Sequence, residues 1–159
     1  MLKLFSSKTL YLVLRIILGG LFVYAGVTKL SDTAAFAQAI DGYGLVTWRM
    51  ANLIAKTLPI LEVASGLGLI FDVRGALGMI VVQLLGFMGV LAYGIHMGLD
   101  VDCGCFGPSD SGGESGGLWP TLIRDMLMFA ACLLIYWQRR CAGIDLRSLI
   151  PPRIFRKTE

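Results

Sequence analysis

Residues 10–30 read LYLVLRIILGGLFVYAGVTKL, a run of 21 residues in which only Arg15, Thr28 and Lys29 interrupt the apolar sequence. A bilayer core requires about 20 apolar residues per helix, so this run is long enough to span a membrane. It is also longer than the apolar region of a cleaved signal peptide, which is about 7–15 residues. We therefore expect a retained transmembrane helix.

Three further apolar runs follow, over residues 51–71, 76–98 and 121–137. The chain of 159 residues is 56% hydrophobic and only 16% charged, whereas soluble domains carry about 25% charged residues. We expect an all-α fold, with one polytopic four-helix membrane bundle over residues 1–137 and a basic tail over 138–159. The lipid bilayer is then the first partner. Nucleic acid is excluded, because no basic face with interleaved aromatic residues exists.

The distribution of basic residues predicts the orientation of the helices. With a cytoplasmic N-terminus, the inside segments (1–9, 72–75 and 138–159) hold nine Lys or Arg, and the outside segments (about 31–50 and 99–120) hold only Arg49. Cytoplasmic loops carry the excess of Lys and Arg in membrane proteins. We therefore expect a bacterial inner-membrane protein with both termini in the cytoplasm and residues 99–120 in the periplasm.

Residues 31–48 show a second pattern. Apolar side chains recur at helical spacing, at Phe36, Ala39, Ile40 and Tyr43, while the polar residues avoid that stripe. This spacing predicts a short amphipathic helix lying at the outer membrane interface.

Each of the four long runs contains one stripe of small and polar residues, which typically packs against neighbouring helices in lipid. These stripes are Arg15, Gly19, Phe22, Gly26 and Lys29 in the first run, Pro59, Glu62 and Gly66 in the second, Gln83, Gly86, Gly89, Tyr93 and His96 in the third, and Asp125, Met128 and Cys132 in the fourth. The sequence therefore predicts a bundle with a polar interior.

Ionisable residues within membrane helices cost about 2.5–3.5 kcal/mol on insertion scales, so they usually have partners. Glu62 lies near mid-membrane, too deep to reach water. We expect Glu62 to pair with a basic group, either Lys29 or Arg124. A network that only fixes helix register is an equally good interpretation. Arg15 and Lys56 are expected to extend their charged ends toward the membrane surface.

The four cysteines fall into two groups. Cys132 and Cys141 lie toward the cytoplasm, where thiols stay reduced, and we expect them to be packing residues. Cys103 and Cys105 lie in the expected periplasmic loop, separated by Gly104. A disulfide across one residue is strained, and it closes too short a loop to stabilise folding. Strained, exposed disulfides are the readily reduced, catalytic kind.

Around these residues the chain resembles the MauE branch of the DoxX-like membrane proteins. The likeness covers most of the chain and rests on residues 20–30, Leu58–Glu62, Asp102–Gly107 and Leu122–Asp125. The Cys-Gly-Cys-Phe-Gly element is its most specific part. Asp125 is a departure, since the family pattern often has Asn there. The resemblance implies a redox-associated four-helix protein, because the family's namesake is tied to disulfide formation during maturation of methylamine dehydrogenase.

The leading functional hypothesis is a thiol–disulfide oxidoreductase or redox partner whose catalytic residues are Cys103 and Cys105. It would exchange with a periplasmic thioredoxin-like protein or a thiol client. No cofactor is firmly implied, although a membrane quinone could accept the electrons. Lys29, Glu62, His96 and Arg124 are the candidates to line a pocket for it and to handle protons.

Two other classes of function fit the same residues. A soft-metal carrier for copper or mercury would use the two thiolates, with Met97 and His96 as further ligands. Two thiolates alone make an incomplete site, so we assign no metal site. A non-catalytic assembly subunit would use the loop to dock a partner. The redox state of Cys103 and Cys105, measured together with bound metal, separates these hypotheses.

Overall fold

The computed structural model of the chain describes residues 8–73, 75–98 and 118–141. This part of the chain is helical: α2 spans Lys8–Ser31, α3 Thr33–Gly42, α4 Trp48–Ile70, α5 Ala76–His96 and α6 Leu118–Cys141. Helices α2, α4, α5 and α6 are long and apolar enough to cross a membrane. The expected all-α fold with four spans is therefore confirmed. Helix α6 is longer at both ends than the apolar run over 121–137.

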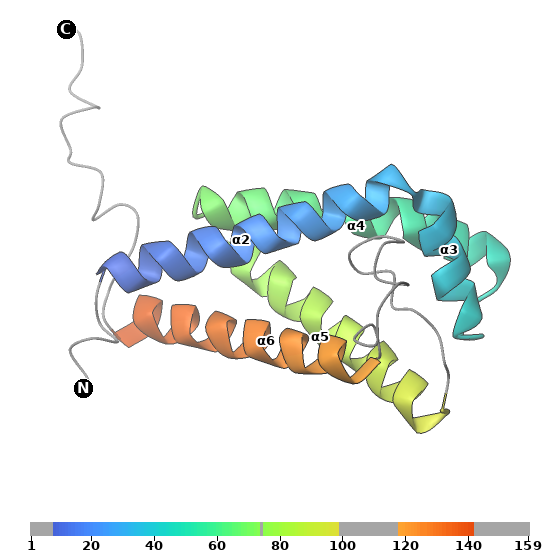
Figure 1. Cartoon of the computed structure of the whole chain (residues 1–159). Coiled ribbons are helices and arrows are strands. Elements are labelled where there is room, and N and C mark those ends of the chain that lie inside the picture. Colours follow the sequence, from blue (N-terminus) through green and yellow to red (C-terminus); the bar gives the residue numbers. More distant parts are fainter. Residues whose placement is uncertain (1–7, 74, 99–117, 142–159) are drawn as a thin grey trace, which may run out of the picture.

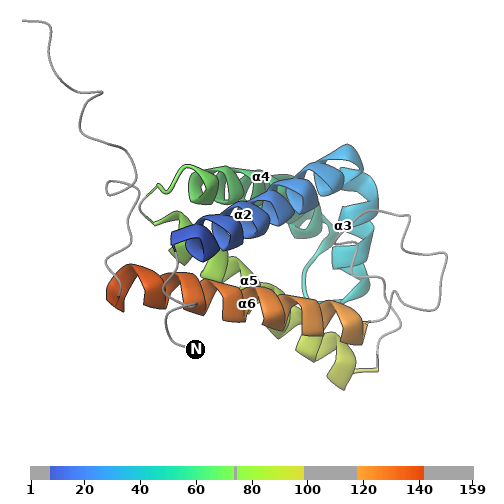
Figure 2. The same ribbon diagram turned by 60° about the vertical axis from the view of Figure 1, so that its left-hand side comes forward.

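The four long helices form two closely packed pairs. Helix α2 packs mainly on α4 and α5 packs mainly on α6, while α3 lies across one end of the bundle (Figures 1 and 2). The main core lies between the pairs, and Cys132 is fully buried within it as a free thiol. Cys132 is therefore a packing residue, as expected. The side chain of Cys141 lies outside the described part of the structure.

The expected amphipathic helix is α3. Its first turn is capped by Asp32, whose side-chain oxygen accepts a hydrogen bond from the Ala35 backbone N–H at 2.9 Å. Its buried face holds Phe36 and Ala37, which pack with Ala55 of α4. Tyr43 follows and packs between α5 and α6 against Leu91 and Leu118. The α3 segment therefore closes one end of the bundle.

Glycines allow the α2–α4 pair to approach closely. A Cβ atom built on Gly19 would lie 2.8 Å from the carbonyl oxygen of Gly66, and one built on Gly66 would lie 2.7 Å from that of Gly19. About two turns further along α2, a Cβ on Gly26 would lie 2.8 Å from the Pro59 carbonyl oxygen. Small residues drive helix association in lipid because they let backbones touch. The stripes expected on these two helices are buried, as predicted.

The inner face expected for the third run is wrong. Gly86, Gly89, Tyr93 and His96 are exposed, and only Gln83 is partly buried, where its Oε1 accepts a hydrogen bond from Ser65 at 3.2 Å. The buried face of α5 is apolar instead, with Ala76, Leu77, Ile80, Leu84, Leu91 and Gly94. The reason is that lipid accepts small and weakly polar residues, so nothing forces such a stripe inward.

The expectation for Arg15 is also wrong. Its side chain is only 6% exposed, and its Nη1 lies 3.6 Å from Oδ2 of Asp72, in the turn after α4. The guanidinium is therefore buried against a carboxylate at the end of the bundle instead of extending into water. Lys56, in contrast, is exposed as expected.

We predict that Gly19→Ala lowers the melting temperature of the purified protein in detergent, because the new methyl group would press against the α4 backbone. Overpacking of this kind costs about 1–3 kcal/mol. Gly20→Ala is the matched control, since a Cβ there meets nothing within 4 Å, and removing a helix glycine gains up to about 1 kcal/mol. Circular dichroism during heating measures both. Equal melting temperatures for the two variants would contradict the close α2–α4 contact.

Candidate functional site

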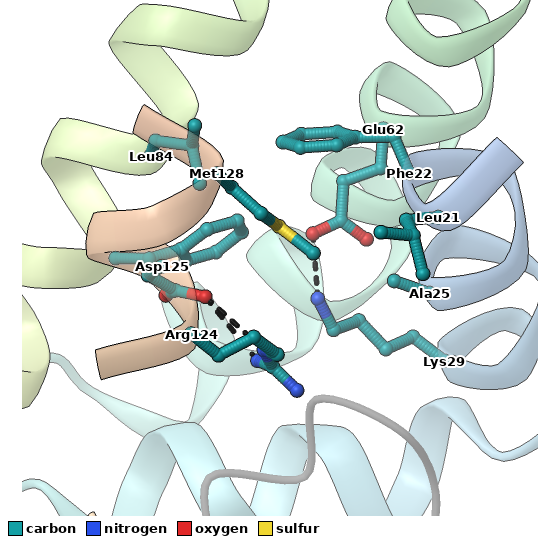
Figure 3. A pocket seen from close by; sticks show the side chains of 10 residues that line it. Leu21, Phe22, Ala25, Lys29, Glu62, Leu84, Arg124, Asp125 and Met128 are labelled. Atoms are coloured by element: carbon teal, nitrogen blue, oxygen red, sulfur yellow. Dashed lines mark hydrogen bonds and ion pairs between the residues drawn. The ribbon is translucent and has the colours of Figure 1, made fainter. Parts of the chain in front are cut away.

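A buried ion pair joins α2 to α4. Nζ of Lys29 lies 2.5 Å from Oε1 of Glu62, and each side chain is only 2% exposed. Long side chains on a helix point back toward its N-terminus, so Lys29 extends from the end of α2 into the bundle. Figure 3 shows the two side chains pointing toward each other. The expected pairing of Glu62 with Lys29 is confirmed.

Two aromatic rings surround the same ammonium group. Nζ of Lys29 lies 4.7 Å from the ring centroid of Phe87 in α5 and 5.2 Å from that of Phe36 in α3. Ammonium groups within about 6 Å of an aromatic face are attracted by its negative electrostatic potential. The Lys29 charge is therefore stabilised by side chains from three other helices.

A second ion pair lies on α6. Arg124 Nη2 and Nε lie 3.3 Å and 3.4 Å from Oδ1 of the neighbouring Asp125. The Asp125 side chain is buried at 5% exposure, whereas that of Arg124 is 33% exposed. Arg124 therefore lies at the boundary between the buried interior of the bundle and its exposed surface.

The two ion pairs line one cavity of about 30 Å³. Its wall is completed by side chains from α2, α5 and α6: Leu21, Phe22, Ala25, Leu84, Phe87 and Met128 (Figure 3). Oε2 of Glu62 is buried and has no hydrogen-bond partner in the described part of the chain. A water molecule needs about 10–15 Å³ of such volume together with two or more polar partners. The cavity therefore has room for one or two waters that would satisfy this oxygen.

The cavity is far smaller than a small-molecule site, which typically has a volume of about 300–1,000 Å³. In the observed arrangement of the helices, the cavity has no room for a quinone ring. The polar pocket expected around Lys29, Glu62 and Arg124 therefore exists, at a size that suits water and protons.

The structure brings together three of the four expected pocket residues. Lys29, Glu62 and Arg124 line the cavity. His96 does not, because it is the exposed last residue of α5, on the face that was wrongly expected to point inward. Asp125 lines the cavity as well, although we expected it only on the inner face of its helix. No group of three or more His, Cys, Asp or Glu able to hold a metal exists among the described residues.

Sequence reasoning missed Phe87. The signal that could have found it is the alternating spacing of three and four residues along α5, at Leu77, Ile80, Leu84, Phe87, Leu91 and Gly94. Such a repeat is typical of the seam by which helices pack in a bundle. Phe87 occupies a position in that seam.

Cys103 and Cys105 lie outside the described residues. In the sequence they lie between α5, which ends at His96, and α6, which begins at Leu118. Arg124 and Asp125 lie within two turns of that point on α6. The polar cavity is therefore toward the end of the bundle where the cysteine segment is attached.

The sequence matches known proteins over most of its length. Residues 7–138 match the model of the family described as methylamine utilisation protein MauE. The methylamine utilization protein MauE of Paracoccus denitrificans is 28% identical over 125 residues, which cover 77% of this chain and 66% of that protein. The match thus spans just under two thirds of that relative's length. No solved structure was found to match.

A match over residues 7–138, together with four apolar helices long enough to cross a membrane, leads to one conclusion. The chain is a membrane protein that belongs to the MauE family.

Proposed function

We propose that the chain is a membrane thiol–disulfide oxidoreductase or redox partner that serves methylamine utilisation through Cys103 and Cys105. The observation that carries the proposal is the cavity lined by Lys29, Glu62, Arg124 and Asp125, toward the end of the bundle where the cysteine segment joins α6. A purely structural membrane anchor has no need for a buried ion pair and a second, partly exposed one around a water-sized cavity. The cited relative's name supports the link to methylamine utilisation.

The proposed reaction is thiol–disulfide exchange with a protein of the thioredoxin-like class or with a thiol client. A thiolate of the partner attacks one sulfur of the Cys103–Cys105 disulfide and forms a mixed disulfide. The second partner thiolate then displaces the cysteine of this chain. The partner dithiol becomes a disulfide, and Cys103 and Cys105 take up two electrons and two protons. The reverse direction uses the same steps.

Two features of the described residues support this proposal. A nearby cation favours the thiolate form of a cysteine, and Arg124, which is 33% exposed, offers one. Starting from ammonium and carboxylate, the Lys29–Glu62 pair would take up a proton at Glu62 Oε2 or give one up from Lys29 Nζ. One or two waters in the cavity would connect it to Asp125.

We place this exchange at the periplasmic face of a bacterial inner membrane, with both termini in the cytoplasm. The excess of basic residues in the expected cytoplasmic segments supports this orientation. A membrane quinone is a second proposed acceptor of electrons from the dithiol. It would approach from the lipid, because the cavity has no room for its ring.

Replacing one cysteine should trap the partner. We predict that Cys105→Ser or Cys103→Ser accumulates a mixed disulfide with a thioredoxin-like periplasmic protein, because no second thiol is left to resolve it. Non-reducing gel electrophoresis followed by mass spectrometry identifies the complex. Cys132→Ser is the control and should trap nothing, since that thiol is buried.

The double Cys→Ser variant should insert and melt like the parent protein while losing exchange activity. The reduction potential of the Cys103–Cys105 pair should lie above about −300 mV, because structural disulfides typically have potentials below that value. A reduction potential below that value would indicate that the Cys103–Cys105 disulfide is structural. Stoichiometric copper or mercury on the reduced pair would instead indicate a metal carrier.

The ion pair can be tested for a role beyond packing. Lys29→Met should destabilise the protein strongly, because removing one partner of a buried pair costs about 3–5 kcal/mol. Lys29→Met with Glu62→Met removes both charges and should recover most of the melting temperature but not the exchange rate. Lys56→Met is the matched control on an exposed lysine. Full exchange activity in the double variant would show that the Lys29–Glu62 ion pair has only a structural role.

The orientation has its own test. A membrane-impermeant maleimide applied to reduced, intact spheroplasts should label Cys103 or Cys105 and leave Cys141 unlabelled, because the reagent reaches only the periplasmic side. Labelling after detergent permeabilisation is the positive control for Cys141. Labelling of Cys141 alone in intact spheroplasts would reverse the proposed topology.

A further inference from the structure

A second buried charge cluster lies at the opposite end of the bundle from α3. Asp72, in the turn after α4, has a side chain only 2% exposed. Its Oδ1 accepts hydrogen bonds from the Tyr11 hydroxyl at 3.0 Å and from Nη2 of Arg139, and its Oδ2 lies 3.6 Å from Nη1 of Arg15. Nε of Arg139 donates to the Tyr11 hydroxyl at 3.0 Å. The turn is thereby tied to α2 and α6.

The charges in this cluster do not balance among the described residues. Two guanidinium groups, Arg15 and Arg139, face one carboxylate, Asp72. Nε and Nη1 of Arg15 are also buried without a hydrogen-bond acceptor in the described part of the chain. An uncompensated charge inside a membrane protein is costly, so an anion that approaches the cluster is stabilised.

The accessible member of the cluster is Arg139. Its side chain is 24% exposed, whereas that of Arg15 is 6% exposed. Arg140 is exposed beside it, and its Nη1 donates a hydrogen bond to the Tyr136 hydroxyl at 2.7 Å. An anion would therefore meet Arg139 first, with the charge of Arg15 behind it.

The position of the cluster matches the headgroup level of a bilayer. Asp72 lies two residues after the last residue of α4, and Arg139 lies in the last turn of α6, so both are at helix ends. Tyr136 and Trp137 are exposed on the preceding turn of α6, and exposed Tyr and Trp are enriched at membrane–water interfaces. Apolar side chains of α2, including Ile16 and Ile17, are exposed nearby along the chain and could contact acyl chains.

We infer that Arg139, backed by Arg15, is a binding site for the phosphate of an anionic phospholipid headgroup. Arginine recognises phosphate through paired N–H donors, and basic pockets between transmembrane helices bind such headgroups. The bound phosphate balances the excess charge of the cluster and holds the α4–α5 turn against α6. This inference is independent of the thiol–disulfide proposal, since it uses the other end of the bundle.

Native mass spectrometry of the purified full chain in detergent tests the site. With phosphatidylglycerol and phosphatidylcholine offered in equal amounts, the parent protein should retain phosphatidylglycerol preferentially. Arg139→Gln should reduce that retention roughly tenfold, the equivalent of one charge-assisted contact. Arg140→Gln is the matched control, because Arg140 lies outside the Asp72 cluster, and it should change retention less than twofold by the same measure.

A third variant separates binding from folding. Arg139→Lys keeps the charge but loses the paired donors, so it should fold like the parent and show intermediate retention. Equal retention of both lipids, or equal loss in Arg139→Gln and Arg140→Gln, would overturn the site. Millimolar inorganic phosphate should leave the lipid in place. Displacement by inorganic phosphate would assign the cluster to free phosphate and overturn the lipid assignment.

Discussion

The arrangement of the bundle depends on the ion pair between Lys29 and Glu62. Either charge alone inside a membrane costs about 2.5–3.5 kcal/mol on insertion scales. Only one register of α2 against α4 lets the two groups meet at 2.5 Å. A shift of one turn, about 5.4 Å, would separate them. The pair therefore selects that register, and Gly19 and Gly66 make it possible because they let the two backbones touch.

The same lysine connects the rest of the bundle. Phe36 of α3 and Phe87 of α5 each place an aromatic ring next to the Lys29 ammonium group. The ion pair of Arg124 and Asp125 on α6 lines the same cavity. A buried charge is satisfied only when all its partners are in place, so these contacts form together or not at all. The surface helix α3 is thus coupled to the interior of the bundle through the aromatic ring of Phe36. This coupling gives the cavity a defined shape.

Sequence reasoning succeeded at the α2–α4 interface, where burial of an uncommon residue carries a large energetic cost, but it did not anticipate that Arg15 is buried against Asp72. The inner faces of α2 and α4 followed from Lys29, Glu62 and the glycines, because a charge or a close backbone contact has few alternative places in lipid. Helix α5 contains no such residue, so its small and polar stripe gave the wrong face, and His96 was misplaced with it. Its apolar seam depends on shape alone. The ion-pair geometry and the cavity volume could be known only from the structure, because both depend on sub-ångström packing.

The two ends of the bundle differ in net charge, and this difference bears on how the protein works. Around the cavity, Lys29 and Arg124 balance Glu62 and Asp125, so the described cluster carries no net formal charge. At the other end Arg15 and Arg139 exceed Asp72, so that cluster favours an anion from outside the chain. A positive end anchors a helix bundle on the cytoplasmic side of a membrane. An anchored bundle with a neutral polar interior toward its other end would suit the proposed thiol–disulfide exchange, because it fixes the positions of α5 and α6, between which the cysteine segment lies in the sequence.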